Sequence, residues 1–164
     1  MQRSLDILIV EDDALVALDF AAIVQAAGHR VLGPVGALRE AVLRCERTDP
    51  DAALIDIDLG GRPDGIRLAA ILHGRGVPCL FVTAHPHVAR DHQHSAYGFL
   101  SKPVAPGALV AAVEAVWRLS QGQSPERVPR ALQLFSQQPA FAPFHAGRRR
   151  SGDDESRGPS PVKG

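Results

Sequence analysis

Carboxylates that follow two apolar runs are the residues of this chain most suited to chemistry. Glu11, Asp12 and Asp13 follow the first run, while Asp56 and Asp58 end another. Carboxylates gathered in a small volume repel one another and hold protons more tightly unless a cation is present. Hard oxygen ligands with room for water suit Mg²⁺. Helix capping explains one acid per strand end, as expected for Asp13, but it does not explain Glu11 beside Asp12. We therefore predict a metal pocket.

A hydroxyl and an ammonium group are expected at the same place. Thr83 ends a further apolar run, and Lys102 follows another. Singly, Thr83 can be interpreted as a helix cap and Lys102 as a solvated surface residue. Together with the acids they suit a phosphoryl group, because a lysine supplies a point charge for phosphate and a hydroxyl donates to a second oxygen. The set predicts a carboxylate nucleophile beside a Mg²⁺-bridged phosphoryl group.

Alternating strand and helix patterns must position these residues. A βαβ arrangement makes the strands parallel, so that their carboxyl ends lie together at one edge of the sheet. Ligands bind at that edge. Strands are predicted at 5–10, 30–32, 52–56, 79–82 and 99–100, and helices up to 27 and over 37–47, 66–73 and 106–119. Proline and several histidines make any helix within 85–96 short or irregular.

Composition is ordinary for a globular protein, with 45% hydrophobic and 22% charged residues. No apolar run reaches the roughly 18–20 residues of a membrane span. Acids directly after the first apolar run argue against a signal peptide, so we expect a cytoplasmic protein.

A net charge of −3 over residues 1–120 and +3 over 121–164 gives no strong case for nucleic acid. Cys45 and Cys79 match no zinc or disulfide pattern.

The composition changes after residue 120. Residues 121–164 are rich in Gly, Pro, Ser, Gln and Arg and lack a sustained period, which predicts a disordered tail behind a domain over 1–120. An apolar patch interrupts this tail and forms, in the alternative interpretation, a short docking segment; its members are Val128, Leu132, Leu134, Phe135, Phe141 and Phe144.

Four motifs in order resemble the response-regulator receiver family over residues 5–119. They read ILIVEDD at 7–13, ALIDIDL at 53–59, FVTA at 81–84 and FLSKP at 99–103. The resemblance implies a doubly wound α/β fold with a five-stranded parallel sheet in the order 2-1-3-4-5. It also implies a cis peptide bond before Pro103.

The resemblance also implies roles for individual residues. Asp56 matches the phosphorylated aspartate, and Thr83 and Lys102 match the residues that bind phosphoryl oxygens. Phe99 matches an aromatic switch residue that turns inward on activation. Mg²⁺ is implied to be bound by Glu11, Asp12, Asp56 and the backbone carbonyl of Asp58, with Asp12 direct and Glu11 more through water.

Two segments depart from the family pattern. The loop at 59–65 is one residue longer than usual, and the segment between Thr83 and Lys102 is shorter and poor in helix formers. The second departure puts standard dimerisation or output in doubt.

Loop sequences resemble small alphaproteobacterial receivers that work with HWE-type histidine kinases. The histidines at 85, 87, 92 and 94 suit a metal or pH sensor poorly, and a solvated surface is the preferred interpretation.

The leading hypothesis is a stand-alone signalling switch that accepts a phosphoryl group on Asp56 from a histidine kinase. It signals to an unknown downstream protein and catalyses only its own phosphorylation and dephosphorylation. A receiver-like binding module that is never phosphorylated is the first alternative. A haloacid-dehalogenase-like phosphatase is the second, although that family places its Asp-x-Asp motif on the first strand.

Overall fold

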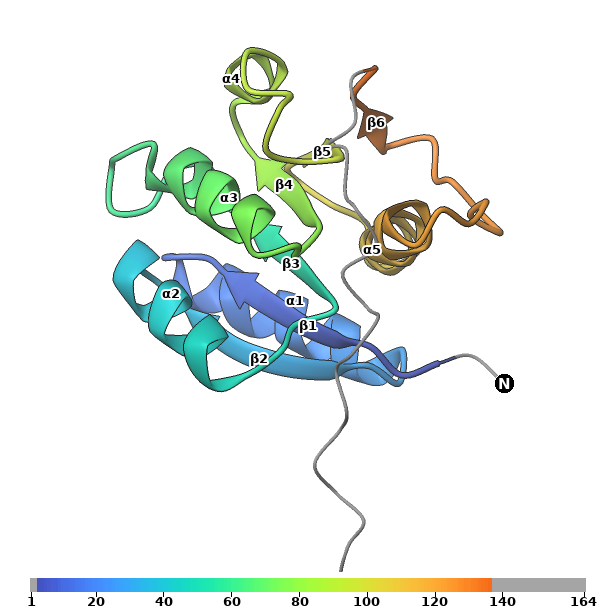
Figure 1. Ribbon diagram of the computed structural model, residues 1–164, viewed down its shortest axis with the longest axis horizontal. Helices are drawn as coiled ribbons and strands as arrows, with labels where there is room; N and C mark the ends of the chain where they lie inside the picture. Colours follow the sequence, from blue (N-terminus) through green and yellow to red (C-terminus); the bar gives the residue numbers. More distant parts are fainter. Residues whose placement is uncertain (1–2, 137–164) are drawn as a thin grey trace, which may run out of the picture.

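The computed structural model describes residues 3–136, which form one sheet with helices on both faces (Figure 1). The strands lie in the order β2-β1-β3-β4-β5-β6. Their bounds are β1 Asp6–Val10, β2 Arg30–Val35, β3 Ala52–Ile55, β4 Cys79–Thr83, β5 Gly98–Ser101 and β6 Gln133–Leu134. The helices are α1 Ala14–Ala26, α2 Leu38–Arg47, α3 Asp64–Gly74, α4 Pro86–Arg90 and α5 Pro106–Ser120.

The first five strands pair in parallel, which confirms the predicted order 2-1-3-4-5. Because side chains alternate along a strand, each strand contributes to two cores. Leu8 and Val10 of β1 pack with α2, α3 and α4 on one face. Ile7 and Ile9 pack with α1 and α5 on the other face. Both faces are therefore covered, as the nearly continuous apolar strands require.

Local sequence signals set the helix boundaries that matter for the site. The Asp13 side chain accepts from the backbone N–H groups of Leu15 and Val16, which confirms its predicted capping role. Gly28, with a φ of 87°, follows the end of α1. Pro86 begins α4, and this helix has only five residues, as the prediction of a short or irregular helix required. The peptide bond before Pro103 is cis, also as predicted.

The sheet has one strand more than the sequence predicted. β6 comes from the region assigned to a disordered tail after residue 120, and it pairs antiparallel with β5. Leu132 and Phe135, which flank β6, are buried. Residues 121–136 therefore belong to the folded unit, and the predicted domain boundary at residue 120 is corrected. The remaining tail, with Phe141 and Phe144 of the apolar patch, lies outside the described residues.

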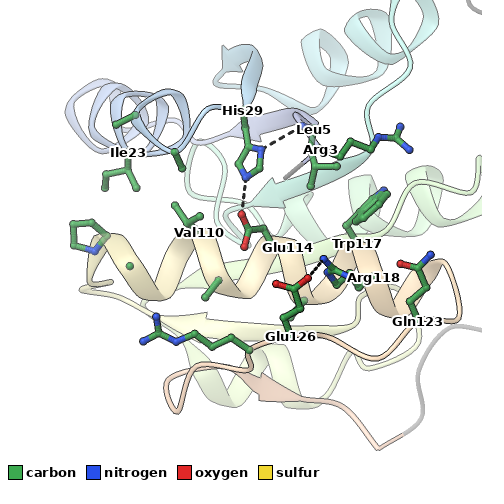
Figure 2. Close-up of a pocket in the computed structure, with 17 residues that line it drawn as sticks. Arg3, Leu5, Ile23, His29, Val110, Glu114, Trp117, Arg118, Gln123 and Glu126 are labelled. Atoms are coloured by element: carbon green, nitrogen blue, oxygen red, sulfur yellow. Dashed lines mark hydrogen bonds and ion pairs between the residues drawn. The ribbon is translucent and has the colours of Figure 1, made fainter. Parts of the chain in front are cut away.

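A hollow of about 1080 Å³ separates part of α1 from α5 (Figure 2). Ile23 lines it from α1 and Trp117 from α5, and an ion pair of Arg118 with Glu126 ties the chain after α5 back to the helix. The carboxylates singled out above lie outside its lining. No helix among residues 3–136 combines the length and apolarity needed to cross a bilayer.

Candidate functional site

Four strands deliver the predicted site residues to one edge of the sheet. Glu11 follows β1, Asp56 follows β3, Thr83 is the last residue of β4, and Lys102 comes directly after the last residue of β5. Parallel pairing places the carboxyl ends of these strands side by side. Short loops then fix each side chain, so that residues up to 91 positions apart come within hydrogen-bond distance.

Lys102 joins the two buried carboxylates of the cluster. Its Nζ donates to Glu11 Oε2 at 2.6 Å and to Asp56 Oδ2 at 2.8 Å. Glu11 is 3% exposed and Asp56 is 8% exposed, so both charges depend on nearby partners rather than on bulk water. The sequence predicted that Lys102 and Asp56 meet at this edge. The close contact with Glu11 is an addition from the structure.

The protonation equilibria of the cluster are shifted by burial and by this contact. Burial raises the pKa of Glu11, and the opposing hydrogen bonds from Lys102 and the Asp13 backbone do not fully offset it. For Lys102 burial acts to lower the pKa, but hydrogen bonds to Asp56 and Glu11 outweigh it and raise the pKa above its usual value. Lys102 is therefore a permanent cation at neutral pH.

The carboxylates fit the predicted cation. Oxygens of Glu11, Asp12 and Asp56 all lie within 4.8 Å of one another. Asp12 is the exposed member, and its Oδ2 accepts from the backbone N–H of Gly60 at 2.9 Å. Three hard oxygen donors with one side open to water match the preference of Mg²⁺ for a few carboxylates and several waters. The Gly60 contact was not predicted, and it holds the glycine-rich loop against the Asp12 carboxylate.

Asp56 is held close to the start of α3. Its Oδ1 lies 3.3 Å from the backbone N–H of Asp58, and its Oδ2 faces Lys102. Gly65 lies against the Asp56 backbone, because a Cβ at position 65 would be 1.9 Å from the Asp56 carbonyl oxygen. The sequence assigned Gly65 only to a loop. In the structure it is the residue that allows helix and strand to approach.

Thr83 and Asp58 are connected through His85. The Thr83 side chain is fully buried, and its Oγ1 accepts from the His85 backbone N–H at 2.9 Å. The His85 ring nitrogen Nε2 lies 3.1 Å from Asp58 Oδ2. His85 is exposed, as predicted, but it is tied to Asp58. A signal was present in the sequence, because each of the two residues stands two positions after a strand-end residue of the site.

Phe99 lies outside the carboxylate cluster. Its ring is 1% exposed and stands 5.8 Å, centroid to centroid, from the ring of Phe135. The guanidinium of Arg90 lies 5.2 Å over the same ring. The sequence did not predict either neighbour, because Phe135 was assigned to a tail.

Comparisons with known proteins identify the family to which this fold belongs. Residues 7–114 match the response regulator receiver domain family. The chain is 33% identical over 111 residues to the phyllosphere-induced regulator PhyR of Methylorubrum extorquens, covering 66% of this chain and 42% of that protein. It is 33% identical over 112 residues to the transcriptional regulatory protein PdtaR of Mycobacterium tuberculosis, covering 66% of this chain and 54% of that protein. The chain thus spans about half the length of these relatives.

A solved structure agrees in fold with good coverage. The signal receiver domain of a modulated diguanylate cyclase from Desulfovibrio desulfuricans superposes with a TM-score of 0.67 at 32% identity. The match covers 73% of this chain and 98% of that one. With its family match across residues 7–114, the doubly wound sheet and the strand-end cluster, the chain belongs to the response regulator receiver domain family.

Proposed function

We propose that this receiver is a phospho-acceptor that takes a phosphoryl group on Asp56 from a phosphohistidine of a histidine kinase. The observation that carries the proposal is the position of Lys102, whose Nζ lies 2.8 Å from Asp56 Oδ2 and 2.6 Å from Glu11 Oε2. A buried carboxylate beside a fixed ammonium and two further acids can attack phosphorus while charge builds on the phosphoryl oxygens.

In the proposed transfer a carboxylate oxygen of Asp56 forms the new P–O bond. The P–N bond to the kinase histidine breaks, and its electron pair returns to the imidazole nitrogen. Lys102 is then placed to pair with a phosphoryl oxygen. Thr83 is placed to donate its hydroxyl proton to another, since a hydroxyl that accepts one hydrogen bond can still donate.

Mg²⁺ would offset the negative charge of the phosphoryl group when bound. The donor set supports Glu11, Asp12 and Asp56 as its side-chain ligands, and we assign the backbone carbonyl of Asp58 as a further ligand. In this proposal Glu11 acts through water and retains its contact with Lys102. The same site would also admit the water that hydrolyses the acyl phosphate, so the protein reverses its own signal.

The experiment is labelling with acetyl phosphate and Mg²⁺, followed by intact mass. We expect wild type to gain one phosphoryl group, Asp56→Asn to gain none, and Asp64→Asn to behave as wild type, because Asp64 is a partly buried acid that pairs with Arg67. Labelling of Asp56→Asn equal to wild type would refute the proposal. Absent labelling with retained partner binding would favour a module that is not phosphorylated, and turnover of a phosphomonoester would favour a phosphatase.

The proposed partners are a histidine kinase, of HWE type by the resemblance of the loops, and one downstream protein. Signalling passes through a protein surface whose population changes when Asp56 carries the phosphoryl group. One relative is consistent with a protein output: a mutant form of the anti-anti-sigma factor PhyR from Bartonella quintana superposes with a TM-score of 0.67 at 27% identity. That match covers 74% of this chain and 52% of that one.

A further inference from the structure

The outer edge of β5 is covered by a segment of this same chain. β6 lies beside β5 at the margin of the sheet (Figure 1), with Gly98 opposite Leu134 and Phe99 opposite Gln133. The backbone N–H of Phe135 donates to the Tyr97 carbonyl at 2.9 Å. An edge strand offers unpaired N–H and C=O groups to any extended chain, and here residues 132–135 use them.

The two buried residues of this segment enter opposite faces of the sheet. Leu132 packs in the core shared with α1 and α5, to which Tyr97 also belongs. Phe135 packs in the other core, with its ring 5.8 Å from that of Phe99. Gln133 and Leu134 between them are exposed. The edge therefore accepts an extended segment with apolar residues three positions apart.

β5 is shaped for the approach of this strand. A Cβ at Gly98 would lie 2.3 Å from the Gln133 carbonyl oxygen and 3.0 Å from the Leu134 Cα. These contacts are with backbone, which cannot swing away as a side chain can. Gly98 is therefore the residue of β5 that leaves room for a paired strand at this edge.

Arg90 forms a hydrogen bond with one side chain of the covering strand, that of Gln133. Its Nη2 donates to Gln133 Oε1 at 3.1 Å while its guanidinium lies over the Phe99 ring. The arginine thus connects α4, the side chain of Phe99 and the occupant of the edge. Besides the backbone and the two apolar side chains, the edge therefore binds a hydrogen-bond acceptor directly after the first apolar residue, here Gln133 after Leu132.

The geometry points to the β5 edge as a strand-binding site for a partner protein. The partner supplies an extended segment of the pattern apolar, hydrogen-bond acceptor, any residue, apolar. Residues 132–135 are the resident occupant, and the partner segment replaces them by adding a strand antiparallel to β5. Opening is driven by movement of Phe99 on phosphorylation of Asp56, and for this trigger the inference rests on the proposed function.

The shortness of β6 supports such an exchange. A strand of two residues is held by few backbone hydrogen bonds, so its local opening costs less than opening of the central strands. Phe99 contacts the occupant directly, so any new position of its ring changes the packing of Phe135. Because residues 132–135 occupy the edge, the apparent affinity for a partner segment equals the intrinsic affinity multiplied by the fraction of molecules in which the edge is open.

The surface is tested without any phosphodonor, using a fluorescent peptide of residues 128–136 and the full-length chain. Leu132→Asp with Phe135→Asp empties the edge, and we expect saturable peptide binding in anisotropy, with wild type binding roughly ten-fold more weakly or not at all. Adding Gly98→Ala to the emptied variant should abolish binding. Gly107→Ala is the matched control, because a Cβ at Gly107 meets nothing within 4 Å.

Failure of the emptied variant to bind, or equal binding after Gly98→Ala, would overturn the proposal. A peptide carrying both aspartates should not bind. If the protein with Leu132→Asp and Phe135→Asp shows no cooperative thermal transition, it has not folded. The milder pair Leu132→Ala with Phe135→Ala then replaces it, and the same results support or overturn the proposal.

The trigger is tested by hydrogen exchange of the Phe135 amide in wild type that mass shows to be phosphorylated. We expect exchange to accelerate about ten-fold relative to the unmodified protein. Unchanged exchange in labelled protein would overturn the link between Asp56 and the edge. A protein that cannot be labelled would instead contradict the proposed function, and the peptide experiment would still decide on the surface.

Discussion

Replacing Lys102 by methionine tests the electrostatic design of the site most directly. Methionine keeps most of the apolar stem but removes the ammonium between Glu11 Oε2 and Asp56 Oδ2, at 2.6 and 2.8 Å. Two carboxylates that are 3% and 8% exposed then face each other without a cation. Breaking a buried ion pair by removing one partner costs about 3–5 kcal/mol.

Lys102 retains a 21% exposed side chain, so water compensates part of this loss and the lower end of the range applies. We expect Lys102→Met to lower the free energy of unfolding by about 3 kcal/mol without Mg²⁺. For a domain of this size that corresponds to a decrease in Tm of about 10 °C. Mg²⁺ should raise the Tm of the variant more than that of wild type, because in wild type the ammonium already offsets part of the repulsion.

The assay is thermal unfolding by circular dichroism, with and without Mg²⁺, beside Arg67→Met as a control. Arg67 is 74% exposed where it pairs with Asp64, so losing that pair should cost less than about 1 kcal/mol. An unchanged Tm of Lys102→Met without Mg²⁺ would refute the reasoning. Equal stabilisation of both proteins by Mg²⁺ would refute the idea that Lys102 offsets carboxylate repulsion, and no stabilisation of either would refute the assignment of the three carboxylates as ligands.

Three further predictions follow from buried contacts. Burial raises the pKa of Tyr97, the single tyrosine, to about 12, so absorbance at alkaline pH should show it ionising there and near 10 in urea. Its raised pKa contributes stability that is complete below pH 10 and is lost, by about 3 kcal/mol, as pH rises through 12; identical titration in both states would contradict this. Gly65→Ala should destabilise the fold by roughly 1–3 kcal/mol and slow labelling of Asp56, because the new Cβ meets the Asp56 carbonyl. Denaturant unfolding and the labelling rate measure these effects, and values equal to those of wild type would argue against that contact. Phe135→Ala should cost about 3 kcal/mol in urea unfolding, against less than 1 for exposed Leu134→Ala, and equal losses would mean that Phe135 is not core.

The sequence was informative about the sheet and the strand ends for a physical reason. Buried strands of a parallel sheet are apolar on both faces, so their ends are marked sharply by the first polar residues, such as Glu11 and Asp56. Parallel connections then require those ends to meet at one edge. The convergence of the acids with Lys102 follows from these two constraints, whereas the order of the first five strands was implied by the resemblance to the receiver family.

β6 could not be predicted in the same way. It has only two residues and lies in a region whose composition favours disorder, so neither length nor alternation marks it. Its stability comes from long-range contacts: Leu132 and Phe135 are single apolar residues whose burial depends on the β5 edge. The His85–Asp58 pair was not predicted although each residue follows a strand end of the site, because the sequence does not show which loop side chains pair.

Gly98 shows how the covered edge and the phosphoryl site belong to one design. β5 delivers Lys102 to the acids at its carboxyl end, and its second residue, Phe99, contacts Phe135. β5 therefore carries residues that contact the charge cluster and residues that contact the covering strand. Gly98→Ala changes the edge through backbone contacts with residues 133 and 134 alone, whereas Lys102→Met changes the cluster alone. If phosphorylation opens the edge through β5, Gly98→Ala should loosen β6 without slowing labelling, and Lys102→Met should slow labelling while leaving β6 protected.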